Sequence, residues 1–204
     1  KGTEHVRADL KRKMSELRAA GGKKKGPASR QVSAFHIERE GAGQVVLAGM
    51  PNVGKSALVD ALTGAQPEVS PSPMTTWEPL PGMMPIDNVQ VQLVDTPPLN
   101  EDFMRSELFQ LMRNADILAI MLDLQAFPFE QYETSLRLLA EHKIVPAEHQ
   151  DTYREAHPDQ RGVAFLPTIV LVNKDDDPAT DEDFAVLEEL LETDLRLLPI
   201  SAQT

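Results

Sequence analysis

The sequence contains no cysteine and no long apolar segment. The absence of cysteine excludes disulfide bonds and metal sites built on thiolates, and it fits a cytoplasmic protein. Apolar runs such as 117–122 are far shorter than the ~20 residues that a transmembrane helix needs, so no membrane span is expected. The first residue is Lys1 rather than Met, so we expect the chain to be a fragment of a longer protein.

Charged residues are distributed unevenly along the chain, whose net charge is −12. Residues 1–30 hold 10 Lys and Arg against 3 Asp and Glu, a net charge of +7, so the remainder carries −19. A basic arm on an acidic body favours a polyanionic partner, such as RNA or the ribosome, for the arm alone. The alternative is a solvated helix and linker without such a partner.

Residues 1–42 are predicted to form a basic helical extension and linker in front of a larger domain. One apolar stripe at helical spacing predicts a helix over 5–19, and its members are Val6, Leu10, Met14 and Leu17. The two glycines at 21–22 end this helix, and the basic sequence 23–27 is typical of a flexible linker.

Residues 43–204 alternate between short apolar strands and amphipathic helices. The predicted strands cover 45–49, 89–94, 117–122, 168–172 and 197–200. The predicted helices cover 55–62, 102–114, 129–142 and 181–192. This alternation indicates an α/β fold of three layers, with a mostly parallel sheet between helices. The polar stretch 146–165 has no clear periodicity, and we expect an insertion or an extended loop there.

A phosphate-binding loop is predicted between the first strand and the first helix of this domain. Residues 49–56, Gly-Met-Pro-Asn-Val-Gly-Lys-Ser, match the pattern G-x-x-x-x-G-K-S. Backbone N–H groups and a helix N-terminus would hold the phosphates, with contacts from Pro51, Asn52, Val53, Gly54, Lys55, Ser56 and Ala57. The alternative, a glycine-rich turn with a chance Lys-Ser pair, does not explain the strand before the loop and the helix after it.

The same strand ends predict a magnesium site. Lys55 would reach the terminal phosphates, and the Ser56 hydroxyl would bind Mg²⁺. Asp95 follows the strand 89–94, where a Walker-B carboxylate faces the metal. An isolated Asp at a strand end is more often a helix cap or a turn former, but the phosphate loop favours the metal-binding interpretation.

A base-binding site is predicted after the strand 168–172. Asn173, Lys174 and Asp176 fit N-K-x-D, and here the sequence resembles the P-loop GTPases. A carboxylate can accept hydrogen bonds from both N1–H and the N2 amino group of guanine, whereas adenine offers no such donor pair. This favours GTP and GDP as ligands over ATP. Ser201 and Ala202 resemble the loop of these GTPases that contacts the edge of the base.

The resemblance extends to the Obg and DRG branch of these GTPases. Residues 73–79, Pro-Met-Thr-Thr-Trp-Glu-Pro, resemble the switch I sequence P-F-T-T-L-x-P, and 95–98 resemble D-T-P-G. The resemblance implies that Thr76, or Thr75 in its place, binds Mg²⁺ and senses the γ-phosphate. It further implies a Mg²⁺-dependent GTPase switch in which Lys55, Thr76 and Asn52 act in catalysis.

Three departures from that branch matter, and a fourth feature bears on catalysis. Pro98 replaces a glycine whose N–H contacts the γ-phosphate, and proline has no N–H. The glycine-rich switch II typical of Obg and DRG proteins is absent. In addition, Leu99 stands where Ras-like proteins have a water-orienting glutamine. The chain also stops at Thr204, before the helix that normally closes the fold, so we expect a domain truncated at its C-terminus.

Two functions therefore remain open. Asn52 stands where potassium-activated relatives hold K⁺ beside the phosphates, which favours a slow GTPase. Alternatively, Asn52 only favours the turn geometry of the loop. Pro98 and Leu99 favour the second function, a GTP- or GDP-binding module with negligible hydrolysis that binds a ribosome, RNA or protein partner.

Overall fold

The structure is a computed structural model that describes residues 33–64, 78–100, 105–176 and 178–202. The predicted helix over 5–19 and the switch residues Thr75 and Thr76 lie outside the described residues. Within the described residues, no helix is both long and apolar enough to cross a membrane.

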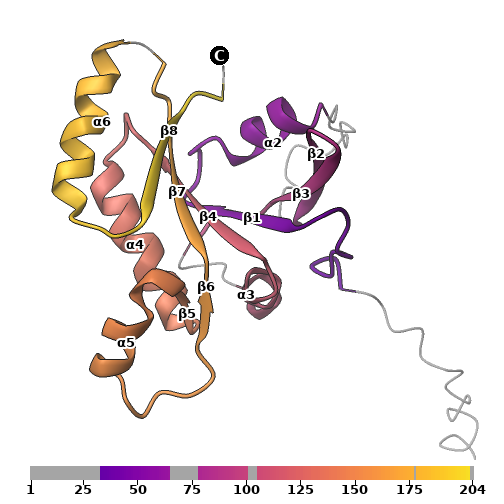
Figure 1. Cartoon of the computed structure of the whole chain (residues 1–204), viewed down its shortest axis with the longest axis vertical. Helices are drawn as coiled ribbons and strands as arrows, with labels where there is room; N and C mark the ends of the chain where they lie inside the picture. The colour runs from indigo at the N-terminus through magenta and orange to yellow at the C-terminus, as the bar shows by residue number, and fades with distance from the viewer. Residues whose placement is uncertain (1–32, 65–77, 101–104, 177, 203–204) are drawn as a thin grey trace, which may run out of the picture. The chain divides into compact units, whose positions relative to one another are not determined.

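A six-stranded sheet with strand order β2-β3-β1-β4-β7-β8 organises the body that begins at Ser33 (Figure 1). Its strands are β1 (Gln44–Gly49), β2 (Leu80–Ile86), β3 (Val89–Asp95), β4 (Ile117–Asp123), β7 (Thr168–Asn173) and β8 (Arg196–Ile200). The edge strand β2 pairs antiparallel with β3, and all other neighbours in the sheet are parallel. The predicted α/β fold with a mostly parallel sheet is confirmed.

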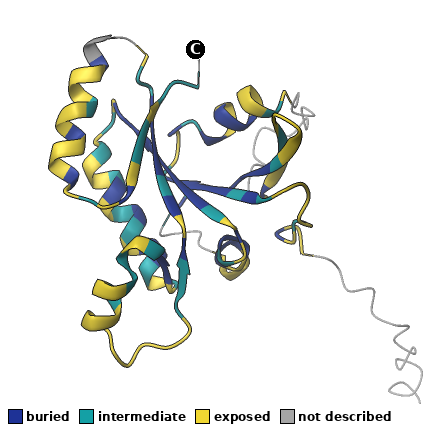
Figure 2. Ribbon diagram, viewed as in Figure 1, coloured by how far each residue is buried: buried dark blue, intermediate teal, exposed yellow. Residues whose placement is uncertain are grey.

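Helices cover both faces of this sheet. Successive strand residues point to opposite sides, so each central strand contributes side chains to a core on each face. Val46 and Ala48 join a core with α3 (Ser106–Arg113), α4 (Pro128–Glu141) and α6 (Pro178–Leu191). Leu47, which lies between them in β1, joins the opposite core with α2 (Lys55–Thr63). The central strands are accordingly buried along most of their length, whereas the outer faces of the helices are exposed (Figure 2).

We expected an insertion or an extended loop at 146–165. The segment contains regular structure, so the extended-loop alternative was wrong. It folds into η1 (Ala147–His149), α5 (Gln150–Ala156) and most of β6 (Ala164–Leu166), and β6 pairs in parallel with β5 (Ile144–Pro146). Strands of three residues and a helix of seven are too short to show a period in the sequence. Arg113 at the end of α3 contacts this segment, because its guanidinium donates to the carbonyl of Gly162. The same guanidinium donates to the carbonyl of His142, just before β5.

Two other differences from the predicted elements concern β2 and α3. The sequence of β2 contains Pro81, Gly82 and Pro85, which disfavour a strand, but an edge strand tolerates proline. The described helix begins at Ser106, and Arg105 before it has extended backbone angles of −85° and 137°. The first residues of the predicted helix, 102–104, lie outside the described residues.

Candidate functional site

The predicted phosphate loop connects the buried strand β1 to the first turn of α2 at the carboxyl edge of the sheet. Asn52 and Gly54 both have positive φ angles, of 65° and 97°, which curl the chain back on itself. The Lys55 side chain crosses the loop, and its Nζ donates to the carbonyls of Gly49 and Met50 at 3.1 Å each. Two backbone carbonyls of the loop itself therefore hold the ammonium.

Ser56 and Asp95, predicted to serve Mg²⁺, lie side by side although they are 39 residues apart in the chain. The Ser56 hydroxyl donates to Asp95 Oδ2 at 2.5 Å. The other carboxylate oxygen, Oδ1, is buried and has no hydrogen-bond partner among the described residues. An orphaned carboxylate oxygen beside a hydroxyl is a donor set that fits Mg²⁺, which prefers oxygen ligands.

Burial sets the electrostatics of these groups. Burial lowers the pKa of Lys55 to about 8, against an opposing, smaller effect of the Asp95 carboxylate. Burial also raises the pKa of Asp95, opposed by its hydrogen bond from Ser56 and by the charge of Lys55. The charged forms of Lys55 and Asp95 are therefore destabilised by burial. A bound anion would stabilise the Lys55 ammonium, and a bound cation would stabilise the Asp95 carboxylate.

A cavity of about 350 Å³ opens over this loop. Its lining includes most of the predicted phosphate contacts: Pro51, Asn52, Gly54, Lys55, Ser56 and Ala57. Glu78, Asp95, Thr96 and Pro98 complete the lining. Val53 alone among the predicted contacts points elsewhere, because its side chain is buried in the core beneath α2.

Leu99, which takes the place of a water-orienting glutamine, does not face this cavity. Its side chain is fully buried in the core, and its N–H donates to the carbonyl of Gly49 at 3.0 Å. Pro98 lines the cavity but offers no N–H. The described part of the loop after β3 is thus hydrogen-bonded to the phosphate loop. Neither Pro98 nor Leu99 presents a catalytic side chain to the cavity.

The predicted base site lies at the same edge of the sheet, one strand beyond β4. The Asn173 amide donates to the carbonyl of Val53 at 2.9 Å, and its oxygen accepts the N–H of Ala202 at 3.0 Å. Only glycine fits at position 54, because a Cβ there would collide with the Asn173 amide nitrogen. Asn173 therefore ties the base-binding segment to the phosphate loop, across 120 residues of sequence.

The remaining predicted base contacts are grouped around this tie. Asp176 is exposed, and one of its carboxylate oxygens accepts a hydrogen bond from the Ser201 hydroxyl at 2.6 Å. Asn173, Asp176, Ser201 and Ala202 thus form one cluster at the ends of β7 and β8. The open side of Asp176 can accept the paired donors of guanine.

Two residues that the sequence predictions missed contact Lys174. Asp123, at the end of β4, forms an ion pair with the Lys174 ammonium. Gln125 donates from its side-chain amide to the Lys174 carbonyl at 3.1 Å. The signal for Asp123 was present in the sequence, because it ends a buried strand as Asp95 does, but no sequence pattern links it to Lys174.

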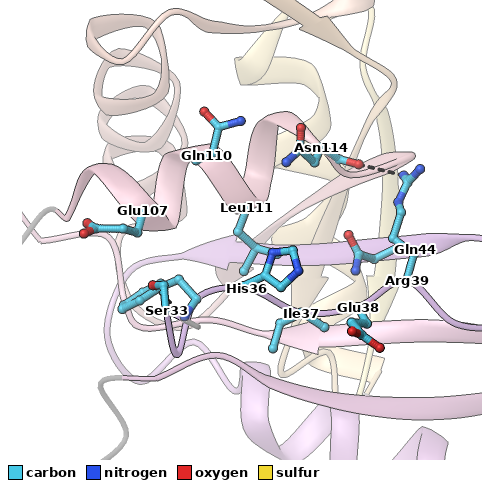
Figure 3. A pocket seen from close by; sticks show the side chains of 11 residues that line it. Ser33, His36, Ile37, Glu38, Arg39, Gln44, Glu107, Gln110, Leu111 and Asn114 are labelled. Carbon is cyan, nitrogen blue, oxygen red and sulfur yellow. Dashed lines mark hydrogen bonds between the residues drawn. The ribbon is translucent and has the colours of Figure 1, made fainter. Parts of the chain in front are cut away.

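A larger cavity, of about 770 Å³, lies away from these residues (Figure 3). It opens between the segment 33–39 and α3, and none of the predicted site residues lines it. Arg39 closes one end by donating to the Asn114 carbonyl and pairing with Asp116. Cavity size alone therefore does not locate the nucleotide site. The assignment of that site depends on the chemistry of the residues that line the smaller cavity.

The family of 50S ribosome-binding GTPases matches residues 44–174, nearly two thirds of the chain. The chain therefore belongs to this family of P-loop GTPases. The match begins at β1 and ends within the N-K-x-D segment, so it spans both the phosphate loop and the beginning of the base site.

Individual relatives support a likeness to the Obg and DRG branch. The chain is 30% identical to the developmentally-regulated G-protein 1 of Arabidopsis thaliana over 60% of this chain and 32% of the relative. It is 36% identical to an uncharacterized GTP-binding protein of Halobacterium salinarum over 48% of this chain and 28% of the relative. The chain thus spans only about a third of the length of the curated relatives that it matches.

Among solved structures, the chain is similar to Era of Aquifex aeolicus bound to GDP and aluminium fluoride. The TM-score is 0.52 at 25% identity, over 78% of this chain and 51% of the Era chain. A second Era structure, in complex with MgGDPNP and a segment of 16S ribosomal RNA, matches with the same score over 82% of this chain and 52% of that chain. These likenesses support the fold assigned from the strand order.

Proposed function

We propose that this protein binds GTP and GDP with Mg²⁺ and hydrolyses GTP slowly, as a molecular switch. One observation carries the proposal: the Asn173 amide is hydrogen-bonded to the carbonyl of Val53 in the phosphate loop. This bond fixes the guanine-selective segment beside the loop that holds phosphates. A nucleotide can therefore place its base against Asp176 and its phosphates over Lys55 at the same time.

Residues of this chain would stabilise the charge that moves during hydrolysis. Water attacks the γ-phosphorus, the bond from that phosphorus to the β–γ bridging oxygen breaks, and GDP and phosphate leave. The charged form of Lys55 would supply positive charge at the phosphate oxygens, and Ser56, Asp95 and Thr76 would hold Mg²⁺. The bound Mg²⁺ would neutralise charge on the β- and γ-phosphate oxygens.

Asn52 supports a role for K⁺ in the same reaction. Asn52 has a positive φ angle, lines the cavity over the phosphate loop and is exposed. A monovalent cation held by the Asn52 side chain beside the phosphates would supply the positive charge that an arginine finger provides elsewhere.

The second candidate function is a nucleotide-binding module with negligible hydrolysis, and the burial of Leu99 favours it. With Leu99 in the core and no N–H at Pro98, neither position orients water or contacts the γ-phosphate. Such a module would act by binding a ribosome, RNA or protein partner. The relatives include Era, one of whose structures contains 16S ribosomal RNA.

Single-turnover hydrolysis of GTP with Mg²⁺, with and without K⁺, separates the two functions. The switch proposal predicts release of phosphate that K⁺ accelerates and that Asn52→Ala renders insensitive to K⁺. Lys55→Ala serves as the matched control, because it should weaken GTP binding itself. Bound GTP that stays intact under both conditions would favour the second candidate.

A further inference from the structure

The loop between β4 and α4, residues 124–127, lies against the predicted base site although it contains none of the residues assigned to it. Asp123 precedes this loop, is 5% exposed and forms an ion pair with the Lys174 ammonium. Its other carboxylate oxygen, Oδ1, accepts the N–H of Gln125 at 3.0 Å. Both oxygens of a buried carboxylate are therefore used to connect this loop to Lys174.

The same loop is fixed from its other side by α4. The Gln131 side chain accepts the N–H of Asp123 at 2.9 Å and donates to the carbonyl of Ala126. Gln125 in turn donates to the Lys174 carbonyl at 3.1 Å. Lys174 is thus held at two points, by its ammonium and by its backbone carbonyl.

Lys174 needs such support because of its backbone conformation. Its φ angle is 70°, in the left-handed region that costs a non-glycine residue free energy. The strained residue lies between Asn173, which ties the segment to the phosphate loop, and Asp176. Its conformation therefore determines how the side chains of the N-K-x-D segment are presented to a base.

We propose that Asp123, assisted by Gln125, is a positioning residue that holds Lys174 in its binding conformation and so sets the lifetime of the bound guanine nucleotide. The inference rests on the proposed nucleotide site. Asp123 does not itself contact the nucleotide and acts through Lys174. Asp176, not Asp123, accepts the hydrogen bonds of the base. Loss of Asp123 therefore weakens the binding of all purine nucleotides that use this site by a similar factor.

The test measures the dissociation rates of fluorescent GDP and of the corresponding inosine diphosphate, which lacks the N2 amino group. Asp123→Asn removes the negative charge that pairs with the Lys174 ammonium. It should raise the dissociation rates of both nucleotides by a similar factor, about tenfold. Gln125→Ala, at an exposed position, should raise both rates by a smaller factor without threatening the fold. Asp176→Ala should instead remove the difference between the two nucleotides.

Asp116→Asn is the matched control, because Asp116 precedes the opposite end of β4 and is likewise paired with a cation, Arg39. It should leave both dissociation rates unchanged. Combining Asp123→Asn with Lys174→Ala should give no greater effect than Lys174→Ala alone, since Asp123 acts through Lys174. A purely structural role would make the two substitutions additive.

Unchanged dissociation rates in both Asp123→Asn and Gln125→Ala, with wild-type protein that binds the nucleotides, would overturn the inference alone. Equal acceleration by Asp116→Asn would also overturn it. A wild-type protein that binds neither nucleotide would contradict the proposed function itself, so the two failures can be distinguished.

Discussion

Lys55 illustrates how a single buried side chain links nucleotide binding to pH. Burial lowers its pKa to about 8 in the free protein, so above that pH most of the ammonium is neutral. Bound phosphates favour the charged form, so binding above this pH requires uptake of a proton. We therefore predict that GTP affinity falls as pH rises above about 8, by up to about tenfold per pH unit.

Isothermal titration in buffers of different ionisation enthalpy measures both the affinity and the proton uptake. Lys55→Arg is the control, because the guanidinium stays charged and should give a flat profile over the same range. A wild-type profile as flat as that of the arginine variant, with no proton uptake, would show that Lys55 does not meet the phosphates.

Pro98 concerns the discrimination between GTP and GDP. Because the proline lacks an N–H, a contact to the γ-phosphate that related GTPases make is missing, and a ligand shifts a conformational equilibrium only by its differential affinity. Pro98→Gly should raise the preference for a non-hydrolysable GTP analogue over GDP, by up to about tenfold if the contact contributes about 1.4 kcal/mol.

Pro98→Ala separates the donor from backbone flexibility, since alanine also restores the N–H. Calorimetric titration of both nucleotides should give a similar gain in the two variants. If wild type already prefers the GTP analogue strongly and neither substitution changes the ratio, another group must reach the γ-phosphate.

At the scale of elements, β7 and the phosphate loop are joined through Asn173. Its side chain is buried and donates a hydrogen bond to the carbonyl of Val53. Asn173→Ala leaves that carbonyl unpaired, so we predict a loss of about 1–3 kcal/mol in the free energy of unfolding of the nucleotide-free protein.

Urea unfolding followed by circular dichroism measures this difference. Ser135→Ala in α4 is the control, because the Ser135 hydroxyl is fully buried and has no hydrogen-bond partner among the described residues. Removing it should be neutral or stabilising. An equal loss in the free energy of unfolding in the two variants would mean that the hydrogen bond from Asn173 to Val53 does not stabilise the protein.

The elements that were predicted correctly from sequence are those with a clear period and length. The central strands are continuous apolar runs, and the helices α2, α4 and α6 are amphipathic or long enough to be found. The antiparallel edge strand β2 was missed because of Pro81 and Pro85, and α5 because seven residues carry little periodicity.

The candidate site was predictable where a residue belongs to a short local pattern, as Lys55, Ser56, Asn173 and Asp176 do. Residues that act through contacts distant in sequence were not. Asp123 lies 51 residues from Lys174, and only the parallel pairing of β4 with β7 brings them together. The burial of Leu99 likewise follows from packing against the core, which a sequence pattern does not reveal.

At the scale of the whole molecule, the charge asymmetry predicts where a polyanion would bind. The arm over 1–30 carries +7 and the remainder −19. We predict that RNA binding depends on the arm and weakens steeply with salt, because Lys and Arg release counterions from phosphates. Deleting residues 1–30 should abolish that binding and leave nucleotide affinity unchanged. Equal RNA binding by the truncated protein, measured by filter binding, would refute this.

In our proposal a single site recognises the guanine base and binds the phosphates of the same nucleotide. Titration of the protein with GTP, GDP, ATP and XTP in the presence of Mg²⁺, in wild type and in Asp176→Asn, is the decisive measurement. We expect binding of GTP and GDP, no comparable binding of ATP, and a shift of preference towards XTP in the variant. Equal affinity for ATP and GTP, or a variant with the same preferences as wild type, would contradict it.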